Sequence, residues 1–273
     1  MDLRPIVITA LCACGSHGGA GLPDAHDDVD AAGSADARLD AAPTACAATI
    51  CEDFEGLPAG PLANGALGAW TVKVTGTVTL AAIDAVKPYA GTRSLHVTVP
   101  AGAAAGATLG RTIAGGLVAG NNLYGRAMVY FSSASGNAAP VNVHSSLFQG
   151  SGTSTVDSGP VTLNWGGGGT QMQLNYHPFG AVESSVKDAP QMTPDAWHCV
   201  QWQFDGSGTP PADVATLWVD GAVVVNVPTS KGWHLATPWS AFNVGFMHYQ
   251  TLAAPADVYV DDIAVDGSMI ACP

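Results

Sequence analysis

The sequence predicts an all-β fold, a sandwich of two antiparallel sheets arranged as a jelly roll. The chain of 273 residues contains 33 Gly and 18 Pro, and only 11% of it is charged, which is typical of turn-rich β domains. Short apolar runs recur between Gly, Pro, Asn and Asp residues, as they do in β-sandwiches. No stretch of twelve residues has a clean helical period, so helices are not expected.

The expected strands follow one another from residue 70 to near the C-terminus. Asp220-Gly221 separates two of them and suits a type I′ turn, so these two runs are expected to form a hairpin. The strands are expected at 70–80, 94–99, 123–131, 141–148, 161–165, 171–176, 198–204, 215–219, 222–227, 242–249 and 258–265.

Three successive expected strands alternate between an apolar and a polar face. In 171–177, Met172, Leu174 and Tyr176 alternate with amides and an imidazole, and a strand turns successive side chains to opposite faces. Planar polar groups and aromatic edges suit sugars, so these faces predict a saccharide groove; an ordinary solvated face is the alternative. The polar faces carry Tyr124, Arg126, Asn142, His144, Gln171, Gln173, Asn175 and His177.

A leader, a linker and one domain divide the chain. In residues 1–14 a basic residue precedes an apolar run that ends in Leu11-Cys12-Ala13-Cys14, which resembles a secretory signal with a lipobox whose lipid would be attached to Cys14. Residues 15–45 are rich in Gly, Ala and Asp, which predicts a disordered linker. Residues 46–273 are expected to form the β domain. The protein is expected at the bacterial outer membrane or cell surface, with plain secretion as the alternative.

The cysteines beyond the leader are even in number, which in an exported protein predicts disulfides. Cys199 lies in an expected strand and Cys272 lies next to the C-terminus, so a bond between them would attach the tail to a sheet. A Cys46–Cys51 bond would close a small loop at the domain entrance. The C-x-x-C pattern typical of zinc sites is absent from the sequence.

Charge excludes two classes of partner. The formal net charge is −13, with 9 Lys and Arg in total, so the phosphate neutralisation that nucleic-acid binding requires is not expected. An anionic membrane would repel the domain, and a lipid anchor is the only membrane contact expected. We expect a monomer.

The first and last strand-like runs of the domain both carry acids at their edges. Glu55 follows the run that starts at Ile50, and Asp261 lies in the last run. If these runs pair in one sheet, the two carboxylates can meet, and carboxylates at a loop edge suit Ca²⁺. A cation-free pair of exposed acids is the alternative.

An ordered set of short motifs runs from about residue 50 to the C-terminus. Its members are Asp53-Phe54-Glu55, Ala90-Gly91-Thr92-Arg93, Tyr124-Gly125-Arg126, Leu174-Asn175-Tyr176, Trp197-His198-Cys199, Trp218-Val219-Asp220-Gly221, Met247-His248-Tyr249 and Val260-Asp261-Asp262-Ile263. The set resembles the glucuronan lyase family (polysaccharide lyase family 20) and the related cellulose-induced secreted proteins of filamentous fungi. The resemblance implies a concanavalin A-like β-jelly roll. It also implies a structural Ca²⁺ bound by the carboxylates of Glu55 and Asp261 and the backbone carbonyls of Ala90 and Arg93.

The resemblance further implies β-elimination of a polysaccharide that contains glucuronic acid. This reaction needs a group that neutralises the C5 carboxylate, a base for the C5 proton and an acid for the leaving oxygen. Arg126 and Gln173 are the candidate neutralisers, and His144 with Tyr176 or Tyr249 are the candidates for proton transfer. Tyr176 shares a face with apolar residues on strict alternation, so its role would require a bulge. The candidates for substrate binding are Tyr124, Asn142, Asn164, Gln171, Gln173, Asn175 and His248.

One departure from the family pattern leaves the activity open. Thr162 and Asn164 stand where the family has a basic cluster, and a groove short of positive charge is a poor host for a polyanion. A non-catalytic carbohydrate-binding lipoprotein that uses Trp165 and Trp202 is therefore the first alternative. A glycoside hydrolase is a weaker one, because it needs two facing carboxylates and Glu occurs only at positions 52, 55 and 183.

Overall fold

The computed structural model describes residues 46–113, 121–133, 144–154, 159–168, 171–178, 180, 183–190, 192–206, 214–234 and 238–273. At 154, 159–168, 171, 188–190 and 229 only the backbone is described. The leader and linker predicted for residues 1–45, with Cys14, and the candidate Asn142 lie outside these residues. Those expectations stay predictions.

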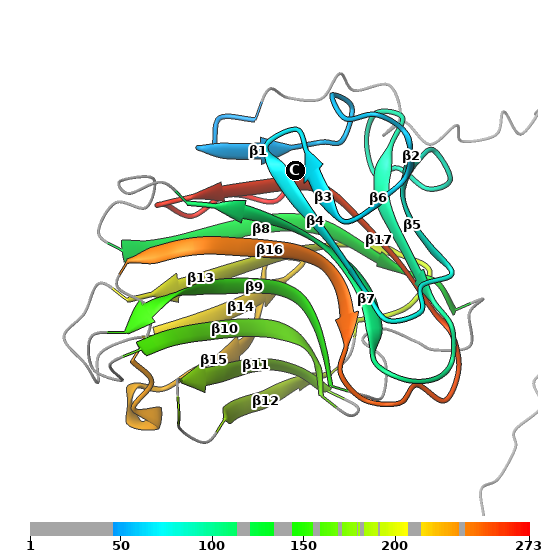
Figure 1. The fold of residues 1–273 in the computed structure, drawn as a ribbon. Helices are drawn as coiled ribbons and strands as arrows, with labels where there is room; N and C mark the ends of the chain where they lie inside the picture. Colours follow the sequence, from blue (N-terminus) through cyan, green and yellow to red (C-terminus); the bar gives the residue numbers. More distant parts are fainter. Residues whose placement is uncertain are drawn as a thin grey trace, which may run out of the picture. The chain divides into compact units, whose positions relative to one another are not determined.

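Two antiparallel sheets form the domain, as the sequence predicts (Figure 1). Sheet A has nine described strands in the order β15-β14-β13-β8-β17-β6-β5-β2, with β1 also paired to β17. Sheet B has eight described strands in the order β12-β11-β10-β9-β16-β7-β4-β3 and lies in front of β13–β15 in Figure 1. Hairpin neighbours such as β9 and β10 alternate with pairs that are far apart in the chain, such as β8 with β17 and β7 with β16, as in a jelly roll. No helix among the described residues is long and apolar enough to span a membrane.

The strands of sheet A are β1 (Ile50–Glu52), β2 (Gly60–Pro61), β5 (Leu80–Asp84), β6 (Ser94–Val99), β8 (Asn122–Phe131), β13 (Trp197–Asp205), β14 (Val214–Val219), β15 (Ala222–Asn226) and β17 (Ala256–Asp266). Those of sheet B are β3 (Gly65–Leu67), β4 (Trp70–Thr75), β7 (Ala105–Thr112), β9 (Ser145–Ser154), β10 (Gly159–Gly168), β11 (Gln171–Pro178), β12 (Ser184–Pro190) and β16 (Trp239–His248). A short 3-10 helix, η3, spans Thr229–Lys231.

Most expected strands are confirmed, and the differences have local causes. The expected run 70–80 is a strand only as far as Thr75, because Gly76 adopts φ 67 and a Cβ there would lie 2.3 Å from the carbonyl oxygen of Ala104, and Leu80 begins the next strand, β5. The expected run 141–148 becomes a described strand only from Ser145. Strands β7 and β12 were not expected, because they are rich in Ala, Gly, Thr and Ser rather than in bulky apolar residues.

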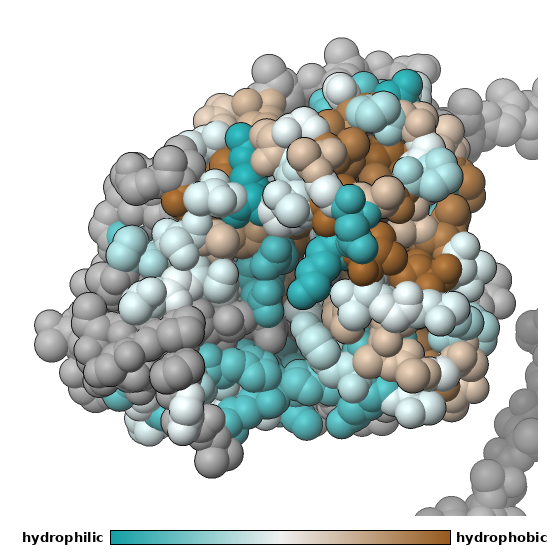
Figure 2. Space-filling view, viewed as in Figure 1, coloured by the Kyte–Doolittle hydropathy of each residue, from teal (hydrophilic) through white to brown (hydrophobic). Residues whose placement is uncertain are grey.

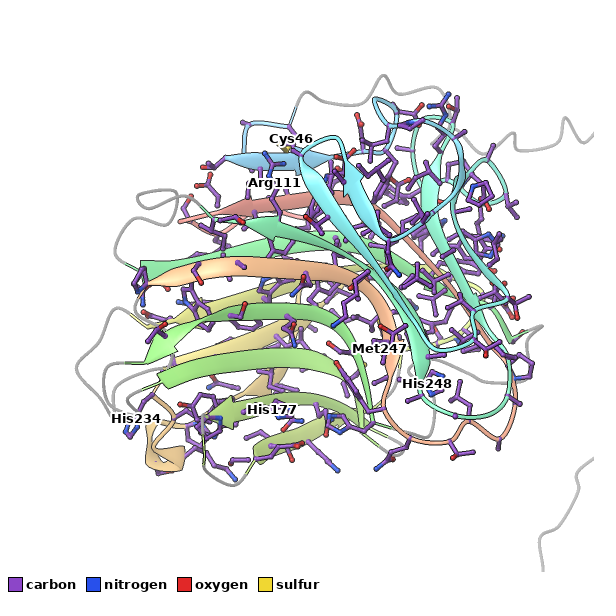
Figure 3. The ribbon with its side chains drawn as sticks, viewed as in Figure 1. Cys46, Arg111, His177, His234, Met247 and His248 are labelled. Atoms are coloured by element: carbon purple, nitrogen blue, oxygen red, sulfur yellow. A yellow bond between two sulfur atoms is a disulfide. The ribbon has the colours of Figure 1, made fainter. Side chains whose placement is uncertain are left out.

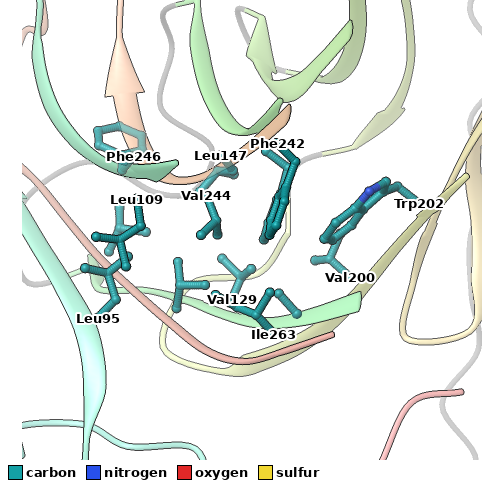
Figure 4. Close-up of a cluster of buried hydrophobic side chains, with 14 of the residues drawn as sticks. Leu95, Leu109, Val129, Leu147, Val200, Trp202, Phe242, Val244, Phe246 and Ile263 are labelled. Carbon is teal, nitrogen blue, oxygen red and sulfur yellow. The ribbon is translucent and has the colours of Figure 1, made fainter. Parts of the chain in front are cut away.

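The inner faces of the two sheets meet in one apolar core (Figure 4). Val129 and Trp202 come from sheet A, and Phe242 and Val244 come from sheet B. The Trp202 ring lies directly on the backbone of Gly125, where a Cβ would lie 1.9 Å from Cζ2. Close packing of this kind holds the two sheets at a constant separation and leaves only their outer faces for binding.

Both predicted disulfides are confirmed. Cys46 bonds to Cys51 at the domain entrance, and Cys199 on β13 bonds to Cys272. The second bond holds the C-terminal segment against sheet A, where Gln201 donates to the carbonyl oxygen of Ile270 at 2.5 Å. This tail therefore covers part of the outer face of sheet A.

Candidate functional site

The outer face of sheet B is the polar face of the molecule that the alternation predicts. Met172, Leu174 and Tyr176 of β11 belong to the core, so the intervening Gln173, Asn175 and His177 project from the opposite face. Figure 2 shows hydrophilic side chains gathered over β11 and β12, and Figure 3 shows His177 on the same side. The predicted division of residues 171–177 into two faces is confirmed.

Four side chains meet on this face, and we call them the imidazole–carboxylate cluster: His144, Asn175, His177 and Glu183. The amide nitrogen Nδ2 of Asn175 lies 2.7 Å from Nε2 of His144 and 3.0 Å from Nε2 of His177. It also donates to Oε1 of Glu183. The two imidazole rings are nearly parallel, with 6° between their planes and 6.2 Å between their centroids. Asn175 itself is only 1% exposed.

Tyr249 adjoins this cluster from the end of β16. Its ring centroid is 5.3 Å from that of His144, and its backbone N–H donates to the carbonyl oxygen of His144 at 2.9 Å. Burial raises the pKa of Tyr249, the charge of Glu183 adds to the rise, and a hydrogen bond with Ser146 opposes it. The phenol is therefore protonated at neutral pH and can act as an acid.

The imidazole of His144 is neutral at neutral pH. Burial lowers its pKa, and the nearby charges of His177 and Lys187 lower it further, against the opposing effect of Glu183. Nε2 lies 2.7 Å from Nδ2 of Asn175, so in the tautomer that leaves Nε2 unprotonated its lone pair points into the cluster. A neutral imidazole with such a lone pair can accept a proton or coordinate a metal ion.

A row of amides continues from the cluster across sheet B. Asn175 is in register with Asn164 on β10, which is in register with Gln149 on β9 and then with Asn243 on β16. Nδ2 of Asn243 donates to Oε1 of Gln149 at 2.9 Å. Gly110, next in the row, has no side chain, and a Cβ there would lie 2.4 Å from Oδ1 of Asn243. The side-chain amides of Gln149 and Asn243 offer donors and acceptors to sugar hydroxyls.

Three expected site residues lie elsewhere. Arg126 is on β8 of sheet A, where its Nη2 pairs with Oδ1 of Asp262 at 2.7 Å and its Nη1 donates to the carbonyl oxygen of Ala271 at 3.1 Å. Tyr124 lies on the same strand. Tyr176 belongs to the core, and its hydroxyl donates to the carbonyl oxygen of His234 at 2.7 Å. The expected convergence of Arg126 with His144 and Tyr176 is therefore not present, because the core separates the two outer faces.

The remaining candidates lie on or near sheet B. Gln173 is on β11, in register with Lys187 on β12. For Asn164 and Gln171 the structure describes only the backbone, on β10 and β11. His248 is fully buried at the end of β16 (Figure 3), where Nδ1 lies 2.7 Å from the carbonyl oxygen of Gln250. It is a framework residue next to Tyr249 rather than a surface group.

Sequence reasoning placed His177 on the polar face without giving it a role in the site, and it did not select Glu183. Both lie next to the turn between β11 and β12, six positions apart. The signal that could have found them is the rarity of Glu in the chain, combined with a nearby His on a polar strand face.

The two acids expected to bind Ca²⁺ meet over one loop. Oε1 of Glu55 accepts from the backbone N–H groups of Thr92 at 2.6 Å and Arg93 at 2.8 Å. Oδ2 of Asp261 accepts from the backbone N–H of Tyr89 at 2.8 Å. Gly91 makes room for this approach, because a Cβ there would lie 2.5 Å from Oε1 of Glu55.

Asp261 provides a test of whether this place suits a cation. The residue is 1% exposed, and burial, with the charge of Asp262 adding to it, raises the pKa of Asp261 to about 7. Within the described residues no basic side chain pairs with it. A buried carboxylate without a counter-charge is unfavourable unless a cation is bound. The donor set is all oxygen, as Ca²⁺ prefers, so these residues fit the ion.

Fold and polar face together define a jelly-roll sandwich with one outer face built from amides and imidazoles. Among solved structures, cellulose-induced protein Cip1 superposes with a TM-score of 0.52 at 17% identity, over 82% of this chain and 100% of that one. The endo-β-1,4-glucuronan lyase of the fungus Trichoderma reesei superposes with a TM-score of 0.53 at 14% identity, over 81% of this chain and 96% of that one. No protein-family model and no curated protein matches the chain. At these identities the similarity concerns the jelly-roll fold.

Proposed function

We propose that the outer face of sheet B binds a polysaccharide that contains glucuronic acid and cleaves it by β-elimination. The observation that carries the proposal is the meeting of His144, Asn175 and Tyr249 on the polar face. The fold shared with a glucuronan lyase supports it. The amide row across β11, β10, β9 and β16 would bind the sugars on either side of the cleaved bond.

Each step of the elimination has a residue on this face. Nε2 of His144 takes the proton from C5, the electron pair forms the C4=C5 double bond, and the bond from C4 to the glycosidic oxygen breaks. The hydroxyl of Tyr249, protonated because burial raises its pKa, gives its proton to the leaving oxygen. Asn175 and Lys187 face the carboxylate on C5 in place of Arg126.

The test compares two tyrosines in the full chain, supplied with Ca²⁺ and uronic-acid polysaccharides. Tyr249→Phe should lower the rate of unsaturated product formation by about 10²–10⁴-fold, as should His144→Gln. Tyr176→Phe is the matched control, because its hydroxyl lies in the core, and it should retain activity. Product is read by the ultraviolet absorbance of the unsaturated uronide. Equal activity of wild type and Tyr249→Phe would refute the role of Tyr249.

A non-catalytic carbohydrate-binding protein is the second candidate. The location of Arg126 on sheet A favours it, because a strong cation expected beside His144 is engaged elsewhere. If no uronan yields product while the protein is retarded on a polysaccharide gel, this second function is correct.

Ca²⁺ at Glu55 and Asp261 is also a proposal, supported by the buried charge of Asp261. The ion would join β17 to the loop before β6 and would take no part in the elimination. Export is supported by the two disulfides. Attachment of a lipid at Cys14 and a monomeric state remain proposals of the same kind.

A further inference from the structure

Three acceptors in the imidazole–carboxylate cluster converge on a single amide nitrogen. Nδ2 of Asn175 carries two hydrogens, yet it faces Nε2 of His144, Nε2 of His177 and Oε1 of Glu183. One amide cannot donate to three acceptors at full strength. When both imidazoles are in the tautomer that leaves Nε2 unprotonated, the cluster directs more lone pairs at one point than Asn175 has amide hydrogens to satisfy.

The other atom of the same amide is in the opposite situation. Oδ1 of Asn175 is buried and has no hydrogen-bond partner among the residues that the structure describes, and the residue is 1% exposed. Buried polar atoms without partners are rare because each costs free energy. Rotation of the amide about its terminal bond would exchange its two atoms and direct Oδ1 toward the three acceptors. With Nε2 of both imidazoles unprotonated, that arrangement places four lone-pair groups around one point, where a bound cation would stabilise them.

We propose that His144, His177 and Glu183 bind a divalent transition-metal ion of the Zn²⁺ class, with Oδ1 of Asn175 as the fourth ligand. Two imidazoles, a carboxylate and an amide oxygen are ligands of the borderline kind that Zn²⁺ accepts in a tetrahedral site. This site is distinct from the oxygen-only site at Glu55 and Asp261. The imidazoles make Ca²⁺, which prefers oxygen ligands, a poor occupant here.

Distances in the cluster are close to those that a shared ion requires. Ligand atoms at 2.0–2.2 Å from one ion stand roughly 3.3 Å apart in a tetrahedron. Nε2 of His144 is 3.8 Å from Oε1 of Glu183, and the ligand atoms of the three residues all lie within 4.8 Å of one another. The side chains of His177 and Glu183 are 35% and 45% exposed, so an ion can enter from solvent and small side-chain movements complete the site.

Occupation of this site has a consequence for the activity. The ion would take the lone pair of His144 on which proton abstraction depends, so bound Zn²⁺ should inhibit the elimination. This consequence rests on the proposed function, whereas binding of the ion does not. The two can therefore fail separately.

Binding is tested by calorimetric titration of the full chain with Zn²⁺ in the presence of saturating Ca²⁺. Wild type should bind one more equivalent of Zn²⁺ than His177→Ala or Glu183→Gln. The difference is the readout, because His17 and His26 precede the described residues and could bind some ion in every variant. His198→Ala is the matched control and should bind like wild type, since His198 pairs with Asp220 on the other sheet. Equal stoichiometry in wild type and His177→Ala would overturn the site.

The activity arm uses the same variants. Zn²⁺ should abolish elimination by wild type, whereas the rates of His177→Ala and Glu183→Gln, each compared with the same variant without the ion, should not change on addition of Zn²⁺. One outcome separates the two proposals: wild type binds Zn²⁺, His177→Ala does not bind it, and Zn²⁺ leaves the elimination rate of wild type unchanged. In that case the metal site stands and the assignment of His144 as the base is overturned. If elimination is absent throughout, the proposed function fails and the calorimetric result decides the metal site alone.

Discussion

Single residues on the outer face of sheet A are held by buried charge pairs. His96 is 6% exposed, with Nδ1 2.6 Å from Oδ2 of Asp84 and Nε2 2.7 Å from Oδ1 of Asp257. Its ring stacks on Tyr259 with centroids 4.0 Å apart. Burial alone would lower the pKa of His96, but the hydrogen bonds and charges of Asp257 and Asp84 raise it overall. The folded state therefore binds this proton more tightly than the unfolded chain does.

The two contacts of His96 with Asp84 and Asp257 predict how the free energy of unfolding depends on pH. The stabilisation from His96 is fully present below the unfolded pKa of about 6.5 and is lost as pH rises through the folded pKa. The free energy of unfolding should fall across that window by at most about 1.4 kcal/mol per pH unit. Urea unfolding between slightly acidic and alkaline pH measures it, and His96→Gln should flatten the slope. A slope that is the same in wild type and His96→Gln would contradict the prediction.

The surroundings of Tyr176 and Tyr249 distinguish a structural tyrosine from the proposed acid. Tyr176 and Tyr249 both lie close in sequence to residues of the polar face. The hydroxyl of Tyr176, however, donates to the backbone carbonyl of His234, and its ring stacks on that of Trp233 with centroids 5.4 Å apart. Tyr249 is 43% exposed and lies beside His144. Alternation along β11 already predicted that Tyr176 faces the core, and the proposed acid is therefore Tyr249.

At the scale of elements, the loop before β6 joins the first and last strands of the domain. Glu55, which follows β1, and Asp261 on β17 both accept hydrogen bonds from residues 89–93. β1 itself pairs with β17 in the register Ile50↔Val265. The terminal strands and this loop therefore form one unit, and a cation there would stabilise all three elements together.

Calcium should raise the stability of this unit. At a Ca²⁺ concentration 100-fold above its dissociation constant, binding to the folded state alone adds about 2.7 kcal/mol. Thermal unfolding with Ca²⁺ and then with a chelator measures the difference, and Asp261→Asn should remove it. Asp266→Asn, at the end of the same strand, is the matched control and should keep the full response. A melting temperature that is insensitive to Ca²⁺ in wild type would exclude the site.

At the scale of the whole molecule, two crosslinks of very different span constrain the chain. Cys199–Cys272 closes a separation of 73 residues, and Cys46–Cys51 closes one of 5. In the chain-entropy description the stabilisation grows with the logarithm of the loop length. The long crosslink also holds the tail over Arg126, whose Nη1 donates to the carbonyl oxygen of Ala271.

Removing the two crosslinks should therefore have unequal effects. Replacing both Cys199 and Cys272 by Ala should cost about 4 kcal/mol of unfolding free energy, and the same change at Cys46 and Cys51 about 2 kcal/mol. Urea unfolding of the two double variants measures both values, with each serving as the control for the other. An equal loss in the two variants would show that loop length does not govern their contribution.

Features that depend on neighbouring residues in the sequence were predicted, whereas features that depend on contacts between distant residues were missed. The strand at Ser94–Val99 and the two faces of 171–177 depend on neighbouring residues, and both were predicted correctly. Strand β7 depends on its pairing with β16 and β4, because its Ala, Gly and Thr residues have no strong intrinsic preference, and it was missed. The imidazole–carboxylate cluster was half predicted, with His144 and Asn175 found and His177 and Glu183 overlooked.

The sequence by itself determined the all-β class and which side chains of an alternating strand share a face, because strand geometry sets these over a few residues, and the number and positions of the cysteines indicated the disulfide partners. Only the tertiary structure decided which strands share a sheet. Arg126 and His144 both lie on polar faces, yet β8 pairs with β13 and β17 while β9 pairs with β10 and β16. The physical reason is that sheet membership depends on long-range pairing and on packing of the entire core, and alternation within one strand carries no information about either.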